Sequence, residues 1–245
     1  MTRIKAICSY DGSEFLGYQK QTKGRTIQEE IEKILSKLLN NETNIVASGR
    51  TDAKVHAEGQ VFHFDTEKED INLDKFRYSM NALLPEDIHI ISLEIVDSSF
   101  NARISATGKH YRYVVNMGEG DPFTFKYEYH LKRKLDIDGI LQGCNLFKGE
   151  HDFKDFTSKE EDFQNFVRRV DDITIKVVGE KVIFDFYGNG FMRYMIRMMV
   201  GTLVAIGLDK EKVDYISNHL DSKANRSITS YKAPGEGLTL IEVFY

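Results

Sequence analysis

Asp52 stands in a segment, SGRTDAKVHAEGQ, whose closely spaced polar side chains could carry out acid–base or nucleophilic chemistry. The flanking runs NIVASG and QVFHFDT have the apolar and β-branched character of strands, so we expect a polar loop at the end of a sheet. One interpretation makes Asp52 a turn residue that bonds its own backbone. Another makes it an acid, base or nucleophile held by arginines. The spacing alone favours the turn.

A metal site is a third interpretation of this segment, because Asp52, His56 and His63 are all of metal-ligand type. His63, however, falls in an alternating strand pattern, which makes this interpretation weak. Cys8 and Cys144 have neither the spacing of a zinc site nor that of a disulfide framework. We therefore expect no bound metal.

The apolar segment FMRYMIRMMVGTLVAIG predicts a helix from about Phe191 to Ile206, and apolar residues on nearly all its sides are typical of a buried helix. Arg193 and Arg197 lie one turn apart on the same side of this helix. Arg193 is close to the helix start, where a long side chain can reach solvent. Arg197 lies deeper, and a buried guanidinium is costly unless an anion pairs with it. We therefore expect an anion beside Arg197.

Two tyrosines alternate in the segment KHYRYVV, which has the composition of a strand. The rings of Tyr111 and Tyr113 should therefore point to one face of a sheet. They form either a pair in the core, which is the commoner use of such residues, or a surface that stacks on a base flipped out of an RNA helix. Periodicity does not separate the two interpretations.

The composition leaves nucleic-acid binding open. The chain has 245 residues, 41% of them hydrophobic and 29% charged, and its net charge of −5 is unfavourable for a phosphate-rich partner. Phosphate binding nevertheless requires only a local basic surface. Basic residues cluster at Lys132–Lys134, at Arg168 with Arg169, and at Arg193 with Arg197. We interpret Lys132–Lys134 alone as a solvated face, whereas Arg168 and Arg169 are candidate phosphate contacts.

The sequence gives no sign of a membrane or secreted protein. The longest apolar stretch contains Arg193 and Arg197, which argues against a plain membrane span. The first residues, MTRIKAICSY, lack the apolar segment of a secretion signal. We therefore expect a cytoplasmic protein without a membrane partner.

Alternating strands and helices must position these groups in the first half of the chain. TIQEEIEKILSKLLN has its apolar residues on one helical face, and Thr26 with Glu29 matches a capping box at its start. LDKFRYSMNALL predicts a second helix, which Pro85 ends. IHIISLEIV is apolar on both faces and is therefore predicted to be a buried strand.

The second half has a similar pattern. DIDGILQGCNLF predicts a helix capped by Asp136, and another helix is expected from about Lys210 to Leu220. VRRVDDITIKVVG and KVIFDFYG predict a pair of strands that turns near Gly179. The whole pattern predicts an α+β fold with two similar lobes. Residues 1–105 would carry the Asp52 loop, and residues 106–245 would carry the Tyr111 strand and the Arg197 helix.

Seven blocks of sequence resemble, in the same order, the TruA family of tRNA pseudouridine synthases. The resemblance covers essentially the whole chain, and GRTD followed by VHA is its most specific part. It implies a central, mainly antiparallel sheet with helices on its faces, built from two related halves. The blocks are YDGSEFLGYQKQ, SGRTDAKVHAEGQ, FNARISATGKHYRYVV, FKGEHDFKDF, VRRVDDITI, YGNGFMRYMIRMMVGTL and KAPGEGLTLIEV.

The resemblance also implies roles for individual residues. Asp52 would be the essential catalytic aspartate, and Arg197 would pair with it. Tyr111 would lie against the target base and assist removal of the proton from C5. Arg50 would occupy the place of the extruded nucleotide in the RNA stem. These roles select the catalytic interpretation of Asp52.

The reaction implied is the conversion of uridine to pseudouridine at positions 38, 39 and 40 of the tRNA anticodon arm. The base must leave C1′, rotate and rejoin through C5, which involves no redox step, so we expect neither a cofactor nor a metal. Asp52 could attack C1′ or remove a proton from C2′, and the sequence does not choose. The family works as a homodimer with shared basic clefts, which would explain how an acidic chain binds tRNA.

Two positions depart from the family pattern. Lys54 stands where the family has glycine, and Tyr18 stands where it usually has tryptophan. If the backbone at residue 54 has φ > 0, lysine would strain the loop. Alternatively, Lys54 adds a phosphate contact or tunes Asp52. The departure at Lys54 also motivates a second functional hypothesis, a tRNA-binding paralogue with weakened catalysis that acts as an RNA chaperone.

Overall fold

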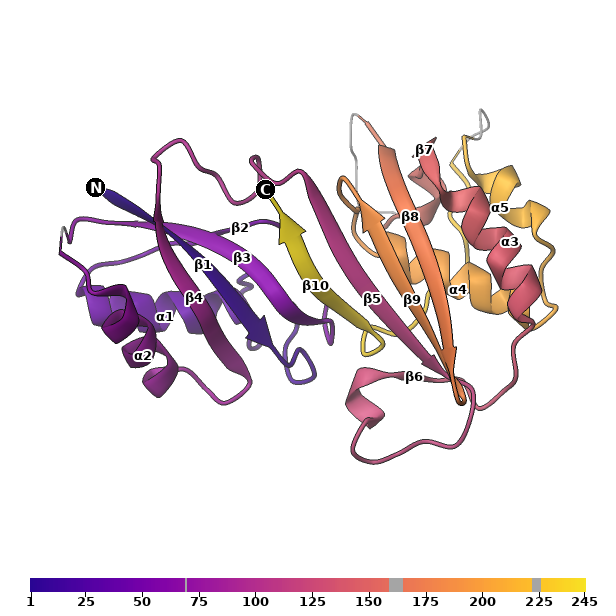
Figure 1. Ribbon diagram of the computed structural model, residues 1–245, viewed down its shortest axis with the longest axis horizontal. Coiled ribbons are helices and arrows are strands. Elements are labelled where there is room, and N and C mark those ends of the chain that lie inside the picture. Colours follow the sequence, from indigo (N-terminus) through magenta and orange to yellow (C-terminus); the bar gives the residue numbers. More distant parts are fainter. Residues whose placement is uncertain (69, 159–164, 222–225) are drawn as a thin grey trace. The chain divides into compact units, whose positions relative to one another are not determined.

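The computed structural model describes residues 1–68, 70–158, 165–221 and 226–245 (Figure 1). The chain divides into two compact units. Unit 1 comprises Met1–Thr107 with Leu240–Tyr245, and unit 2 comprises Gly108–Thr239. The last residues of the chain thus belong to the same unit as the first. The division into folding lobes at residues 105 and 106 stays a prediction.

Where the structure describes it, unit 1 is an antiparallel sheet with two helices beside it (Figure 1). The C-terminal strand β10 (Leu238–Phe244) follows β3 in the strand order, and helix α2 packs against α1 and β4. The apolar stripe of α1 is buried, as its periodicity predicts. The other elements, in sheet order and then along the chain, are β4 (Ile88–Val96), β1 (Thr2–Tyr10), β3 (His56–Thr66), β2 (Val46–Ala47), α1 (Ile27–Leu39) and α2 (Leu73–Leu83).

The described residues of unit 2 contain a second run of antiparallel strands and three helices. Strand β6 (Tyr129–His130) pairs in parallel with β5, and helix α3 packs against α4, α5 and β8. Two short 3₁₀ helices lie at Phe125–Tyr127 and Lys154–Phe156. The remaining elements are β5 (Gly108–Asn116), β9 (Lys181–Gly188), β8 (Val167–Val178), β7 (Gly149–Asp152), α3 (Ile137–Phe147), α4 (Met195–Gly207) and α5 (Asp214–His219).

The predicted fold class, α+β with a mainly antiparallel sheet and packed helices, is confirmed. Two local predictions are confirmed as well. The Asp136 carboxylate accepts the Asp138 and Gly139 N–H groups at 3.1 and 3.3 Å, so Asp136 is the helix cap. Strands β8 and β9 form the predicted hairpin, with Val178 opposite Lys181.

Three sequence predictions are wrong in detail. Thr26 has extended backbone, but its fully buried side chain makes no capping hydrogen bond. Strand β4 is not buried on both faces, since it lies at the end of the strand order and exposes Ile91 and Ile95. Helix α4 begins at Met195 and not near Phe191, because Tyr194 has a left-handed backbone with φ 64°.

None of the helices within the described ranges combines the length and the apolar character needed to cross a bilayer.

Tyr18 provides a test of the packing in unit 1. Its side chain is 2% exposed, burial raises the pKa of its hydroxyl, and that hydroxyl has no hydrogen-bond partner among the described residues. A buried polar group without a partner destabilises the folded state. We expect Tyr18→Phe to raise the free energy of unfolding by about 1 kcal/mol in denaturant titration. The matched control is Tyr113→Phe, because the Tyr113 hydroxyl donates to the Pro234 carbonyl at 2.7 Å. This control should lose about 1 kcal/mol, and equal losses in both variants would contradict the assignment.

Candidate active site

The Asp52 loop is attached to the segment that follows strand β1. The Tyr18 N–H donates to the Thr51 carbonyl at 3.0 Å, and the Lys54 N–H donates to the Phe15 carbonyl at 3.4 Å. The Asp52 carbonyl accepts the Val55 N–H at 3.2 Å, so the backbone turns at Asp52. The predicted turn is therefore present in the main chain. The Asp52 side chain is half-buried.

Hydrogen bonds from buried side chains hold the first residues of the loop in place. The Tyr10 hydroxyl and the Thr51 hydroxyl are hydrogen-bonded at 2.8 Å. Gln60, which is fully buried, accepts from the Ser48 hydroxyl at 2.8 Å and donates to the Gly49 carbonyl at 3.0 Å. These contacts leave little freedom to the backbone that precedes Asp52.

Two glycines allow the attachment, and their role was missed by the sequence analysis. A Cβ atom at Gly12 would lie 2.1 Å from the Val55 carbonyl oxygen. A Cβ atom at Gly17 would lie 2.9 Å from the Thr51 carbonyl oxygen, and Gly17 also has φ +109°. The only sequence signal was the presence of both glycines in the block YDGSEFLGYQKQ.

The two histidines of the metal interpretation have structural contacts. The His56 Nδ1 atom accepts the Gly12 N–H at 3.0 Å, and the His63 Nδ1 atom accepts the Ala102 N–H at 3.1 Å. Both side chains are buried, and burial lowers the pKa of His63. No group of three potential ligands that could hold a metal occurs within the described ranges. These contacts favour a role in the fold for His56 and His63.

Lys54 has the backbone conformation that a glycine would favour. Its φ is +65°, in the left-handed region, and its side chain is exposed. The condition under which lysine would strain the loop, φ > 0 at residue 54, is therefore met. A non-glycine residue in this region costs about 1 kcal/mol, so the loop beside Asp52 stores a small strain.

The strain at Lys54 is measurable by a pair of substitutions. Lys54→Gly and Lys54→Ala remove the same charge, but only glycine relieves the backbone. We expect Lys54→Gly to be about 1 kcal/mol more stable than Lys54→Ala in denaturant titration. Equal stability of the two variants would show that the left-handed conformation carries no cost.

Arg50 lies on the surface of unit 1, two residues before Asp52. Its Nη1 atom donates to the Gln19 side-chain oxygen at 2.9 Å, and the residue is exposed. Gln19 belongs to the same segment that holds the loop. The position suits a side chain that contacts a partner in solution.

In unit 2, Tyr111 and Tyr113 both point to the buried face of β5, as the alternation predicts. The Tyr113 ring is fully buried, and its neighbour Gly237 has no room for a Cβ atom, which would lie 2.6 Å from that ring. Tyr111 is 7% exposed, and its ring meets the Phe191 ring edge-on at 5.5 Å. Tyr113 is thus a core residue, whereas the predicted base contact of Tyr111 stays a prediction.

Arg197 is held by the segment that precedes β10. Its Nε atom donates to the Ala233 carbonyl at 2.9 Å, and its own carbonyl accepts the Ala233 N–H at 2.8 Å. Gly201 permits this close approach, because a Cβ atom there would lie 2.7 Å from the Lys232 nitrogen. Arg197 is half-buried and Arg193 is exposed, as predicted for the latter. The pairing of Arg197 with Asp52 stays a prediction.

The two arginines at the start of β8 differ in their contacts. Arg168 is half-buried, its Nη1 atom donates to the Asn165 and Val167 carbonyls at 3.2 and 2.7 Å, and burial lowers its pKa. Arg169 is exposed, and its Nε atom donates to the Asp171 carboxylate at 2.6 Å. An exposed ion pair of this kind contributes little energy, so a phosphate could replace Asp171.

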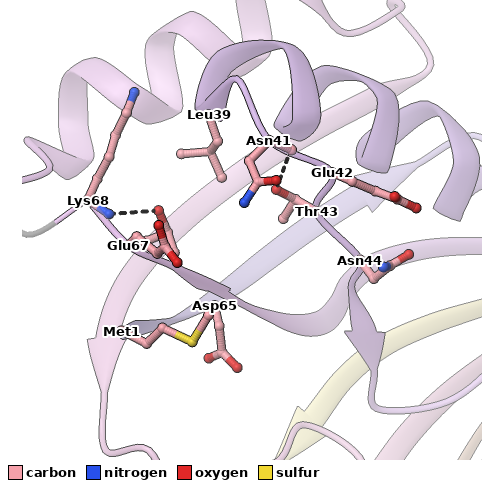
Figure 2. Close-up of a pocket in the computed structure, with 10 residues that line it drawn as sticks. Met1, Leu39, Asn41, Glu42, Thr43, Asn44, Asp65, Glu67 and Lys68 are labelled. Carbon is pink, nitrogen blue, oxygen red and sulfur yellow. Dashed lines mark hydrogen bonds between the residues drawn. The ribbon is translucent and has the colours of Figure 1, made fainter.

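One pocket of unit 1 lies away from all the predicted site residues (Figure 2). It is bordered by the end of α1 and the end of β3, and polar side chains form much of its wall. The Thr43 hydroxyl donates to the Asn41 carbonyl at 3.0 Å within it. Its lining residues are Met1, Leu39, Asn41, Glu42, Thr43, Asn44, Asp65, Thr66, Glu67 and Lys68.

The structure thus brings Arg50, Asp52 and Lys54 together on one loop of unit 1. Tyr111 and Arg197 belong to unit 2. Tyr194 was not predicted as a site residue, and its ring lies beside the Arg197 guanidinium with 5.1 Å between ring centroid and Cζ. Its signal was the aromatic residue between two arginines in FMRYMIR.

The chain is similar to known proteins over most of its length. A family model described as tRNA pseudouridine synthase matches residues 6–103 and 144–245, which include Asp52 and Arg197 but not Tyr111. The tRNA pseudouridine synthase A of Streptococcus uberis is 41% identical over 249 residues, covering 100% of this chain and 99% of that protein. That of Listeria monocytogenes serotype 4b is 42% identical over 248 residues, covering 100% of both.

Among solved structures, one titled as a Cbf5-Nop10-Gar1 complex matches with a TM-score of 0.40 and 12% identity, over 96% of this chain and 57% of that chain. A structural similarity at this level supports no conclusion about fold or function. The family match and the full-length relatives are sufficient: the chain belongs to the family of tRNA pseudouridine synthases.

Proposed function

We propose that this protein converts uridine to pseudouridine at positions 38, 39 and 40 of the tRNA anticodon arm, with Asp52 as the catalytic carboxylate. The observation that carries the proposal is the Asp52 loop in a chain of this family. Its backbone is fixed by the Tyr18 N–H at one side of Asp52 and by the turn to Val55 at the other. A carboxylate on a fixed loop needs little reorganisation when it meets the ribose.

The chemistry is an isomerisation. The bond from C1′ to N1 of the base breaks, the base rotates, a bond from C1′ to C5 forms, and C5 loses its proton while N1 gains one. Asp52 attacks C1′ or removes the proton from C2′, and both roles require its ionised form. Arg197 favours that form by its charge, and Tyr111 assists the loss of the proton from C5. No step needs an oxidant, a metal or a cofactor.

Binding of the RNA is assigned to cationic side chains of both units. Arg50 and Lys54 are exposed on the loop that carries Asp52, and Arg50 takes the place of the extruded nucleotide. Arg168 and Arg169 at the start of β8 contact the phosphate backbone. The charge of each contributes to an affinity that decreases with salt.

We further infer a cytoplasmic homodimer. A net charge of −5 requires that basic surface be concentrated locally for tRNA to bind, and two subunits that share a cleft would do this. Phe123 and Phe125 of unit 2 are 91% and 61% exposed. Exposed apolar side chains of this size are typical of surfaces that another chain covers. Sedimentation at micromolar concentration tests the assignment, and a monomer would contradict it.

Three tRNA transcripts test the positions, each with uridine at only one of positions 38, 39 and 40. We expect conversion in each transcript, measured as pseudouridine at the one position of the three that carries uridine. Conversion only outside the anticodon arm would refute the positions but keep the reaction. Binding of tRNA without any conversion would support the alternative, a tRNA-binding RNA chaperone. None of the contacts described above favours that alternative.

A further inference from the structure

Three cationic side chains gather around the ring of Tyr194 in unit 2. Lys232 Nζ lies 4.4 Å from the ring centroid, Arg193 Cζ 4.8 Å and Arg197 Cζ 5.1 Å. The Arg193 Nη2 atom also donates to the Tyr194 hydroxyl at 3.0 Å. Arg193 and Lys232 are exposed, whereas Tyr194 and Arg197 are half-buried. The cluster therefore has a solvent-facing side and a side that adjoins the Arg197 guanidinium.

The backbone at Tyr194 is held in an unfavourable conformation. Its φ of 64° lies in the left-handed region, which is rare for a large aromatic residue. Its carbonyl nevertheless accepts the Met198 N–H at 2.8 Å, so Tyr194 is the N-cap residue that precedes helix α4. Strained residues of this kind occur often at functional sites, where the surrounding structure enforces them. The strain at Tyr194 therefore points to a function for its ring.

The charge at the cluster favours an anion. Three like charges around one ring repel one another, and attraction to the ring face offsets this only in part. The beginning of α4 adds the positive end of the helix dipole, and the Tyr194 side chain makes no capping hydrogen bond there. A phosphodiester group has the charge and the acceptor oxygens that two guanidinium groups and an ammonium group would bind.

We propose that Arg193, Lys232 and Tyr194 form a phosphate-binding site for the RNA backbone beside Arg197, in which Tyr194 positions the Arg197 guanidinium. This assignment rests on the proposed function, since the phosphate belongs to the RNA strand that carries the target uridine. Arg193 and Lys232 would contribute to RNA affinity. Tyr194 is a positioning residue, and its effect would appear in turnover through Arg197.

The binding part is tested by the salt dependence of tRNA affinity. Arg193→Gln and Lys232→Gln should each lower the slope of log affinity against log salt by about 0.7 to 0.9, the loss of one phosphate contact. The matched control is Lys176→Gln, because Lys176 is exposed on β8 outside the cluster. Its slope should equal that of the wild type. Unchanged slopes in both cluster variants, in a wild type that binds and converts tRNA, would refute the site and leave the proposed function intact.

The positioning part is tested by single-turnover rates at saturating protein. Tyr194→Leu should slow conversion about tenfold, because it removes the ring under Arg197, whereas Tyr194→Phe keeps the ring and should restore the wild-type rate. Tyr194→Gly also removes the ring but relieves the backbone strain, so its denaturant midpoint, compared with that of Tyr194→Leu, separates a slow rate from instability. Equal rates for Tyr194→Leu and Tyr194→Phe would overturn the positioning role. A wild type that converts no uridine would instead reject the proposed function itself.

Discussion

Asp52→Asn is expected to abolish pseudouridine formation while leaving the fold and the tRNA affinity nearly unchanged. Asparagine has the same shape, and backbone hydrogen bonds of the loop use the Thr51 and Asp52 carbonyls and the Lys54 N–H. What the substitution removes is the ionised oxygen that acts as nucleophile or base. We expect turnover to decrease at least about 10³-fold, as for the loss of an essential acid, base or nucleophile.

The measurement is the single-turnover rate on an unmodified tRNA, together with the tRNA dissociation constant and the denaturant midpoint. Asp70→Asn is the matched control, because Asp70 is an exposed aspartate of the same unit outside the loop. The control should stay within about twofold of the wild-type rate, because surface substitutions of this kind have small effects. Turnover retained by Asp52→Asn would reject Asp52 as the catalytic group.

Gly12→Ala is expected to have the largest effect on stability. The added Cβ atom would lie 2.1 Å from the Val55 carbonyl oxygen and 2.6 Å from the Val55 carbonyl carbon, which are backbone atoms and cannot rotate away. The loop that carries Asp52 must therefore shift. Forced overpacking of this kind costs about 1 to 3 kcal/mol, and we expect a value near the upper end. Because the shift moves Asp52, the turnover of the remaining folded protein should decrease as well.

Gly190→Ala is the matched control for this substitution. A Cβ atom at Gly190 would meet no atom within 4 Å, so its free energy of unfolding should change by less than about 1 kcal/mol. Denaturant titration of both variants gives the comparison. Equal stability of the two would show that the close approach of Gly12 to Val55 does not fix the loop.

Local signals predicted the elements of this fold well. The apolar periodicity of α1, the Asp136 cap of α3 and the hairpin of β8 and β9 each depend on residues close in sequence. The position of a strand in a sheet, in contrast, does not depend on nearby residues alone. IHIISLEIV is apolar on both faces, but β4 lies at the end of the strand order, and nothing within the segment itself distinguishes an edge strand from a central one.

The candidate site was predictable to the extent that single residues carried it. Asp52 and Arg197 were found because a family motif and an apolar helix singled them out. Their supports were missed, since they come from distant parts of the chain: the Tyr18 N–H holds the Thr51 carbonyl, and the Ala233 carbonyl holds the Arg197 guanidinium. Contacts over such separations leave no periodic signal in the sequence.

Lys54 shows how the family pattern and the structure complement each other. The family pattern raised the question of its backbone, and the structure gives φ +65°. The loop keeps the left-handed conformation that glycine favours although the residue is lysine. Two contacts with the segment after β1 hold the loop there. The Lys54 N–H donates to the Phe15 carbonyl, and Gly12 closely approaches Val55. The surrounding contacts, and not the local preference of Lys54, therefore determine the loop.

The most direct test of the account is the pseudouridine content of one unmodified tRNA after incubation with the wild type and with Asp52→Asn at equal tRNA occupancy. The account predicts pseudouridine in the anticodon arm with the wild type and none with the variant. Pseudouridine formed equally by both proteins, or by neither when both are folded and bound, would contradict it.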